Sequence, residues 1–336
     1  MNEKSEFTFP PVETIEGITP QSFAAVFERQ TPVVLKGLVA HWPAVKAGLQ
    51  GAESLRDYLK ALDGGKPATV SEAPASSGGL FFYGDDLSEY NFNKRDRSLS
   101  EALDQIVANG DRADAPVVAI QMIPTATHLP GFAADNPSPL LPPQFGPRLW
   151  AGGRTVSQTH NDGEHNIACV VGGRRRFVLF PPDQVGNLYI GPFERAPPLS
   201  LVRIDAPDFA RFPKFREALD SAVVADLGPG DAVFIPKHWW HHVTSLDGFN
   251  VLINYWWGKS PAGLEDPYLT FQTALLAIRA LPESQRDYWR AMFDTYVFSG
   301  GGAEHIPPAL RGLLGDVGPQ VRARLKDELK AVVLKV

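Results

Sequence analysis

The sequence of 336 residues lacks several features that mark particular kinds of protein. Its single cysteine, Cys169, excludes an intrachain disulfide and a zinc site built from cysteines. No apolar run approaches the ~18 residues that a membrane-spanning helix needs. The first fourteen residues have neither the positively charged start nor the apolar core of a secretory signal. We therefore expect a cytoplasmic protein that does not enter a membrane.

Charge of one sign is not concentrated in any part of the chain. The formal net charge is −6, and the lysines and arginines are scattered. A protein that binds nucleic acid or an anionic membrane surface needs a basic patch. We therefore expect no nucleic-acid partner, and a protein or a small molecule as the substrate.

The first 150 residues mix helical and strand patterns. We predict helices beginning after Thr19, at Ser54 and after Ser98, and strands over residues 32–38, 80–83 and 116–123. Ser98 and Glu101 have the spacing of a capping box. Residues 129–147 contain six prolines and predict an irregular connection, which either lines a substrate entrance or is an inert surface loop.

Residues 150–257 consist of short runs rich in β-branched and aromatic residues, separated by Gly and Pro turns. Residues 167–171 and 176–180 flank Gly172-Gly173, which predicts a hairpin. This pattern is typical of an antiparallel barrel or a double-sheet jelly roll. We place the catalytic domain at 1–260, with its core at 150–257, and a helical region at 261–336.

The helical region has two apolar stripes at helical spacing. They are formed by Leu264, Tyr268, Phe271, Leu275 and Ile278, and by Val321, Leu325, Leu329, Val332 and Val336. Such stripes must be covered, so we expect them to pack on the barrel or to form a homodimer through these helices.

His160 and Asp162 are the starting point for a functional site. Two residues apart in a strand, they point to the same face and can hold one metal ion. A third ligand is available in the run Trp239-Trp240-His241-His242. In a strand its two histidines point to opposite faces, so only one of them can bind the same ion, and strand periodicity alone does not show which. His165 lies off the two-residue period and is disfavoured. Two histidines and one carboxylate form the triad of non-haem Fe(II) oxygenases.

A 2-oxo acid bound to such an iron would need a cation for its distal carboxylate. Arg175 alternates with Phe177 and Leu179 in the predicted strand, so it should face the barrel interior. A guanidinium binds a carboxylate through two parallel hydrogen bonds. Asn166 and Asn254 are amides in apolar strands, and they pair either with the cosubstrate or with backbone groups.

These residues resemble the cupin-like JmjC-type Fe(II)/2-oxoglutarate-dependent oxygenases, in the branch similar to the asparaginyl hydroxylase that inhibits hypoxia-inducible factor. The matching segments are Thr159-His160-Asn161-Asp162 with Asn166, residues 173–182, residues 230–236 leading to Trp239-Trp240-His241, and Asn254-Tyr255-Trp256. The resemblance spans roughly residues 32–257. It implies a mainly β fold with flanking helices, a double-stranded β-helix preceded by α/β elements and followed by a helical, often dimer-forming tail.

The resemblance also implies roles for individual residues. His241 becomes the third metal ligand beside His160 and Asp162, and Arg175 stands where the hydroxylase has a lysine for the cosubstrate. Ser157, Asn166 and Asn254 would help to bind 2-oxoglutarate, and Gln121, Trp240 and Trp256 would lie near the substrate.

The implied activity is hydroxylation of a C–H bond with Fe(II), 2-oxoglutarate and O2, releasing succinate and CO2. Two other classes fit a metal-binding barrel. One is a non-catalytic cupin that acts as a sensor or scaffold, and the other is a metal-assisted hydrolase. Neither needs a cation for a distal carboxylate.

Overall fold

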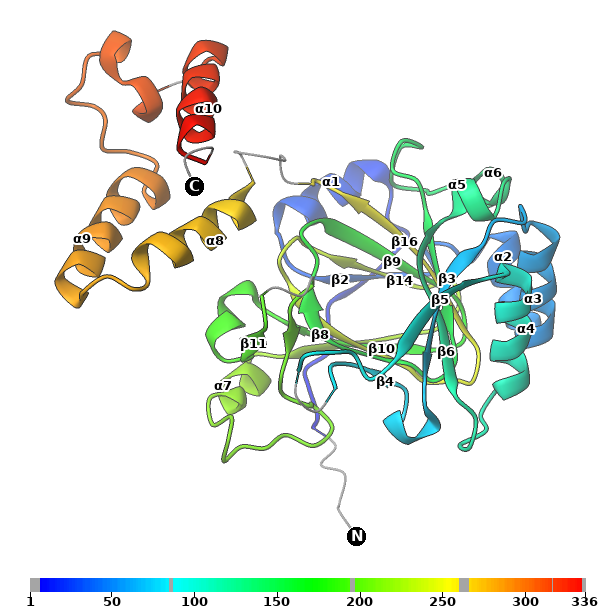
Figure 1. The fold of residues 1–336 in the computed structure, drawn as a ribbon. Helices are drawn as coiled ribbons and strands as arrows, with labels where there is room; N and C mark the ends of the chain where they lie inside the picture. The colour runs from blue at the N-terminus through cyan, green and yellow to red at the C-terminus, as the bar shows by residue number, and fades with distance from the viewer. Residues whose placement is uncertain (1–6, 85–86, 194–196, 260–265, 316, 334–336) are drawn as a thin grey trace. The chain divides into compact units, whose positions relative to one another are not determined.

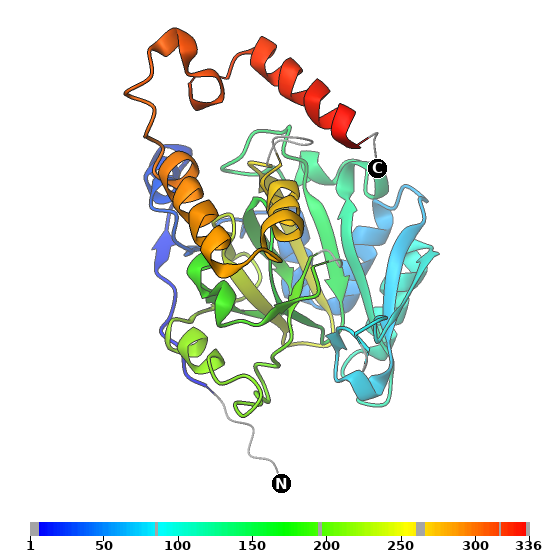
Figure 2. The ribbon, with the colours of Figure 1, turned by 60° about the vertical axis from the view of Figure 1, so that its left-hand side comes forward.

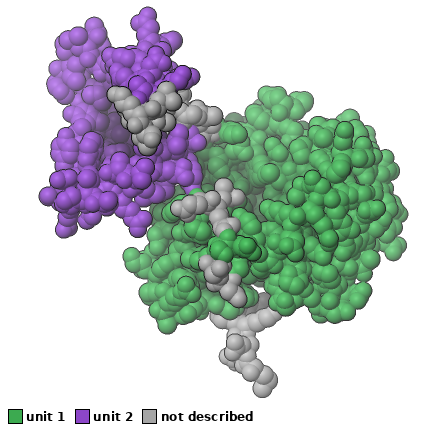
Figure 3. Space-filling view, viewed as in Figure 1, with its two compact units in different colours: residues 1–259 green, residues 260–336 purple. Residues whose placement is uncertain are grey.

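Two β-sheets face each other in the first of two units into which the chain divides, residues 1–259 (Figures 1 and 3). The computed structural model describes residues 7–84, 87–193, 197–259, 266–315 and 317–333. The larger sheet has nine strands in the order β1-β2-β14-β9-β16-β7-β6-β3-β5, and the smaller has five in the order β13-β10-β15-β8-β4.

The strands of the larger sheet are β1 (Thr14–Glu16), β2 (Val33–Lys36), β3 (Ala68–Ala73), β5 (Asn93–Arg97), β6 (Val117–Pro124), β7 (Arg148–Gly152), β9 (His165–Gly172), β14 (Ala232–Ile235) and β16 (Asn250–Trp257). Those of the smaller sheet are β4 (Leu80–Phe81), β8 (Val156–Asn161), β10 (Arg175–Phe180), β13 (Val223–Leu227) and β15 (Trp240–Ser245). A third, two-stranded sheet pairs β11 (Ile190–Gly191) with β12 (Leu199–Ser200).

The chain crosses repeatedly from one large sheet to the other. From β7 to β10 successive strands alternate between the sheets, and they do so again from β13 to β16. This winding is the predicted double-stranded β-helix. Its interior is filled by apolar side chains from both sheets, among them Phe177, Leu179, Val243 and Leu252. The two inward faces therefore form one core between the sheets.

The hairpin predicted across Gly172-Gly173 is wrong. β9 pairs with β14 and β16 in the larger sheet, whereas β10 pairs with β13 and β15 in the smaller one. The connection through Gly173 and Arg174 instead carries the chain from one sheet to the other. Gly173 has a φ of +70°, and a Cβ there would lie 2.5 Å from the Asn250 side-chain oxygen. A glycine turn thus serves a crossover as well as a hairpin.

Helices cover the outer face of the larger sheet (Figures 1 and 2). They include α1 (Pro20–Glu28), α2 (Pro43–Gln50), α3 (Ala52–Ala61) and α4 (Leu99–Asn109). The predicted start of α1 is confirmed, because Thr19 caps it through the Ser22 backbone amide. The predicted start at Ser54 is late by two residues, because Gly51 separates α3 from α2, a helix that the sequence patterns did not reveal.

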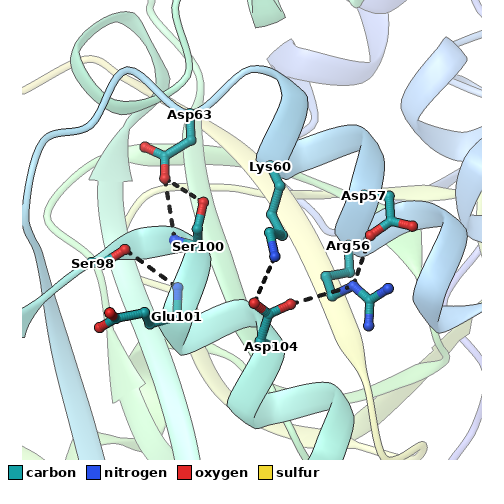
Figure 4. Close-up of polar contacts among 8 residues, drawn as sticks. All are labelled: Arg56, Asp57, Lys60, Asp63, Ser98, Ser100, Glu101 and Asp104. Carbon is teal, nitrogen blue, oxygen red and sulfur yellow. Dashed lines mark hydrogen bonds and ion pairs between the residues drawn. The ribbon is translucent and has the colours of Figure 1, made fainter.

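Polar contacts join α3 to α4 on their exposed side (Figure 4). Lys60 Nζ lies 2.6 Å from Asp104, and Arg56 lies 3.5 Å from the same carboxylate. The Asp63 carboxylate accepts hydrogen bonds from the backbone and side chain of Ser100. Ser98 accepts the Glu101 amide at 3.4 Å, which is one of the two hydrogen bonds of the predicted capping box. Exposed pairs of this kind add little stability, so the apolar face holds the helices.

Residues 129–147 form a largely exposed connection with a few buried anchors. They contain α6 (Phe132–Asp135), which follows the short α5 (Thr125–His128), and the Phe132 side chain is fully buried. Asn136 accepts the Ala44 amide at 3.0 Å, and the Pro137 carbonyl accepts the Trp42 indole N–H at 2.9 Å. These contacts anchor residues 129–137 beside the start of α2, and both predicted alternatives for the connection stay predictions.

The second unit, residues 260–336 (Figure 3), is helical in the part that the structure describes (Figure 1). It comprises α8 (Pro267–Ile278), α9 (Glu283–Phe293), a π-helix (Asp294–Phe298), 3-10 turns at Pro308–Leu310 and Gly312–Leu314, and α10 (Pro319–Val333). Tyr268, Phe271, Leu275 and Ile278 lie on α8, and Val321, Leu325 and Leu329 lie on α10. Leu264 and Val336, and the side chain of Val332, fall outside the described residues. No described side chain of α8 or α9 is buried.

Among the residues described, no helix has the length and apolar character needed to cross a membrane.

Candidate metal centre

Three predicted ligands converge in the first unit. His160 on β8 and His241 on β15 are direct cross-strand partners, and Asp162 follows β8 by one residue. One ligand atom from each lies within 4.8 Å of the other two. The Asp162 carboxylate is 3.6 Å from His241 Nε2 and 4.0 Å from His160 Nε2. Two imidazole nitrogens and one carboxylate oxygen are the ligand set of a non-haem Fe(II) site. Such a site leaves the remaining coordination positions of the iron open to other ligands.

Backbone carbonyls set the tautomer of both histidines. His160 Nδ1 lies 2.7 Å from the Gln158 carbonyl oxygen, and His241 Nδ1 lies 3.1 Å from that of Trp239. A carbonyl only accepts, so both Nδ1 atoms carry the proton and both Nε2 atoms present a lone pair. Metal-binding histidines are commonly oriented in this way.

Burial keeps His241 neutral. Burial, with the nearby His160 adding to its effect and Asp162 opposing it, lowers the pKa of His241 to about 4. A neutral imidazole is the form that binds a metal. The choice between His241 and His242 is decided by the fold, since His242 points to the other face of β15. Its pKa is also lowered to about 4 by burial, and its Nδ1 has no hydrogen-bond partner.

His165 lies outside the site, as its spacing predicted. Its Nδ1 accepts the Lys237 backbone amide at 3.1 Å, and its ring packs among the aromatic side chains of Phe27 and Trp257.

The two predicted amides lie beside the triad. Asn166 Nδ2 donates to the Asp162 carboxylate at 3.3 Å, and Asn254 Nδ2 donates to Asn166 Oδ1 at 3.3 Å. Asn254 Oδ1 in turn accepts the indole N–H of Trp150 at 2.8 Å. They therefore bond to other side chains rather than to the backbone. Each keeps a second N–H, and their predicted contact with a cosubstrate stays a prediction.

Arg175 occupies the interior face of β10, as its alternation with Phe177 and Leu179 predicted. Its side chain is 8% exposed, and its Nε has no hydrogen-bond partner. Burial lowers its pKa to about 10, so it remains charged at neutral pH. Its neighbours in the chain face outward, where Arg174 pairs with Asp247 and Arg176 with Asp226. A buried cation without an acid partner is costly unless a ligand supplies one.

A cavity of about 630 Å³ opens beside His160. Ser157 and Gln121 line it, and Gln121 accepts a hydrogen bond from Ser71 at 3.2 Å. Strict alternation would place Ser157 and His160 on opposite faces of β8. A register shift opposite His241 and Val243 turns both toward the cavity. The other lining side chains include Tyr90, Phe92, Lys94, Asp96, Met122 and Trp150.

The placement predicted for Trp240 is wrong. It alternates with His241, faces the opposite side of β15 and packs against Phe180 and Phe215, with its indole donating to the Pro182 carbonyl at 3.3 Å. Phe215 belongs to α7 (Phe215–Asp220), which covers this outer face.

Trp256 faces the interior, where its ring meets Trp150 edge-on at 6.0 Å. Its indole N–H is buried without a partner. Its proximity to a substrate stays a prediction.

The sequence patterns did not single out Trp150. Its position on β7 between Leu149 and Ala151, both fully buried in the outer core, was the available signal, since alternation turns Trp150 inward. Alternation along β7 does not predict that the Trp150 indole N–H bonds to Asn254.

Comparison with known proteins gives a consistent result. A family model described as a cupin-like domain matches residues 19–263. Lysine-specific demethylase JMJ31 of Arabidopsis thaliana is 40% identical over 128 residues, which cover 36% of this chain and 23% of that protein. HSPB1-associated protein 1 of Homo sapiens is 43% identical over 93 residues, covering 27% and 19%. Lysine-specific demethylase 8 of Danio rerio is 23% identical over 269 residues, covering 76% and 61%. The matches thus span less than two thirds of these relatives.

Proposed function

Because the chain belongs to the cupin-like domain family, we propose that it is an Fe(II)- and 2-oxoglutarate-dependent dioxygenase that hydroxylates a C–H bond of its substrate. The observation that carries the proposal is the group of His160, Asp162 and His241, whose ligand atoms lie within 4.8 Å of one another. Bound Fe(II) would supply the redox chemistry that converts 2-oxoglutarate and O2 into succinate and CO2.

Arg175 would hold the distal carboxylate of 2-oxoglutarate. On the smaller sheet, Leu179 lies opposite His241, and Arg175 lies four residues earlier on the same interior face. Four residues of strand span about 13 Å, a distance that an arginine side chain and a five-carbon diacid can bridge together. The diacid would give the unpartnered Nε an acceptor and neutralise a buried charge. Neither a sensor nor a hydrolase requires this cation.

The cavity beside His160 would receive the substrate. Gln121 and Ser157 offer hydrogen bonds, and Tyr90, Phe92 and Trp150 offer aromatic walls. Two of the relatives are named lysine-specific demethylases, and a methyl group on a lysine presents a C–H bond of the required kind. A protein side chain is therefore the substrate class that we favour over a small molecule.

The helical unit would join two copies of the chain. Leu276 is 86% exposed and Phe298 is 73% exposed, and α8 is apolar on more than one face. A second copy would cover such surfaces. Light scattering coupled to gel filtration measures the mass, and a monomer at all concentrations would exclude this part of the proposal.

The test of the oxygenase proposal is a titration under nitrogen, first with Fe(II) and then with 2-oxoglutarate. Chelation of the 2-oxo acid gives a weak visible charge-transfer band. We expect the band in the wild type and in His242→Ala, and its loss in His241→Ala. The histidine pair is a matched control because the same change is made one residue apart on opposite faces of β15. Iron binding without the band would favour a non-catalytic cupin, and succinate formation retained in Asp162→Ala would contradict the assigned ligands.

A further inference from the structure

Four side chains form a continuous line of hydrogen bonds that ends at the candidate metal centre. The Trp150 indole N–H donates to Asn254 Oδ1 at 2.8 Å, Asn254 Nδ2 donates to Asn166 Oδ1 at 3.3 Å, and Asn166 Nδ2 donates to Asp162 Oδ2 at 3.3 Å. The line starts on β7, crosses β16 and β9, and reaches the residue that follows β8. It therefore links the larger sheet to a ligand held by the smaller one.

The direction of this line is determined by its two ends. An indole N–H can only donate, and an ionised carboxylate can only accept. If the Asn254 amide were reversed, its NH2 group would face the indole N–H. If the Asn166 amide were reversed, its oxygen would face the Asp162 carboxylate. Each reversal sets like groups against each other, so Trp150 and Asp162 together permit one orientation of both amides.

Burial prevents water from replacing a lost member. Asn254 is 1% exposed and Asn166 is 6% exposed. In an antiparallel sheet, diagonal neighbours on one face are within reach of long side chains, and Trp150 and Asn254 are such neighbours. Breaking one bond would leave a buried amide unsatisfied and free to turn, and hydrogen bonds in such a line strengthen one another.

We propose that Trp150 is a positioning residue for the metal centre, which orients the Asp162 carboxylate through the two amides. The proposal rests on the proposed function only in assigning Asp162 as a metal ligand. Trp150 would contact neither metal nor cosubstrate in this role. Its effect would reach the carboxylate because the Asn166 N–H points at Oδ2 only while Trp150 holds Asn254 in place.

The experiment measures the affinity and the visible spectrum of Co(II) bound to the full chain, without cosubstrate. Trp150→Phe removes the indole N–H and keeps an aromatic ring. We expect its Co(II) dissociation constant to rise about 3- to 10-fold, with a changed d–d band, because partners that orient metal ligands commonly contribute 10- to 100-fold and Trp150 acts through two intermediates. Asn166→Ala should weaken binding by at least about tenfold.

Trp42→Phe is the matched control. Its indole N–H also donates to one acceptor, the Pro137 carbonyl at 2.9 Å, and it lies in the outer core. A purely structural effect would lower the stability of both variants and move Co(II) affinity in neither. We also expect Trp150→Phe to cause no further loss in an Asn166→Ala background, since both changes break the same line.

Three results would overturn the inference alone: an unchanged Co(II) affinity in Trp150→Phe, an equal loss in Trp42→Phe, or a full additional loss in the Asn166→Ala background. Failure of the wild type to bind Co(II) would instead remove the proposed function together with the inference.

Discussion

Replacing Arg175 by methionine should make the ligand-free protein more stable and unable to bind 2-oxoglutarate. The guanidinium is buried on the interior face of β10, and its Nε has no hydrogen-bond partner. Methionine is also unbranched and flexible, and it carries no charge. If Arg175 is present for a ligand, the folded protein bears the cost of desolvating it whenever that ligand is absent.

The size of the gain follows from the pKa of Arg175. Burial lowers it from 12.5 to about 10. A difference of one in pKa corresponds to about 1.4 kcal/mol, so the charged guanidinium costs the folded state about 3 kcal/mol at neutral pH. Because the folded-state pKa lies below the unfolded one, this cost is complete below pH 10 and disappears as the pH rises toward 12.5. Arg175→Met should therefore raise the free energy of unfolding by up to about 3 kcal/mol at pH 7.

The assay is urea unfolding followed by tryptophan fluorescence, with Mn(II) present under nitrogen and with or without 2-oxoglutarate. At a concentration one hundred times its dissociation constant, a ligand that binds only the folded state adds about 2.7 kcal/mol. The wild type should show this stabilisation, and Arg175→Met should not.

Arg176→Met is the control, because Arg176 faces outward on the same strand and pairs with Asp226 at 2.7 Å. It should change the free energy of unfolding by less than about 1 kcal/mol and keep the response to 2-oxoglutarate. A destabilised Arg175→Met would show that the guanidinium is satisfied in the folded protein. An Arg175→Met variant still stabilised by 2-oxoglutarate would refute its role with the cosubstrate.

Three further predictions concern the framework of the first unit. Gly48→Ala should lower the free energy of unfolding by about 1–3 kcal/mol, because a Cβ there would lie 2.2 Å from the Val171 carbonyl oxygen. Gly146→Ala is the control, because the space around Gly146 is open, and it should leave the thermal or urea unfolding unchanged. Cys169 should react with a thiol reagent only on unfolding, because burial raises its pKa, and rapid reaction of the native protein would contradict this. Asp231→Ala should cost about 3–5 kcal/mol of unfolding free energy, since the buried carboxylate accepts three hydrogen bonds of 2.9 to 3.1 Å; a loss below 1 kcal/mol would refute that estimate.

Local patterns were sufficient for the features that depend on one element at a time. The two-residue spacing of His160 and Asp162, and the alternation of Arg175 with Phe177 and Leu179, each describe one face of one strand. The structure places these side chains as that periodicity requires. The resemblance to the cupin-like family is also confirmed, because the model of the cupin-like domain matches residues 19–263.

Features that depend on which elements become neighbours were not predictable in this way. Gly172-Gly173 predicted a hairpin because a turn signal is local, whereas the pairing of β9 and β10 with other strands is decided by the packing of two sheets. The family resemblance placed Trp240 near the substrate, whereas the structure turns it to the face of β15 opposite His241, as adjacent residues of a strand require.

The sequence by itself determined the strands, their inward and outward faces and the chemistry available on each face, because backbone periodicity is set by sterics within a few residues. Periodicity did not choose between His241 and His242; the family resemblance chose His241, and the tertiary structure brings it to His160. Only the tertiary structure decided that Trp150 reaches Asp162 through two amides. These contacts join residues up to 104 positions apart, between Trp150 and Asn254. The register of β15 on β8 and of β16 on β7 and β9 brings them together, and the burial of the whole core stabilises that register.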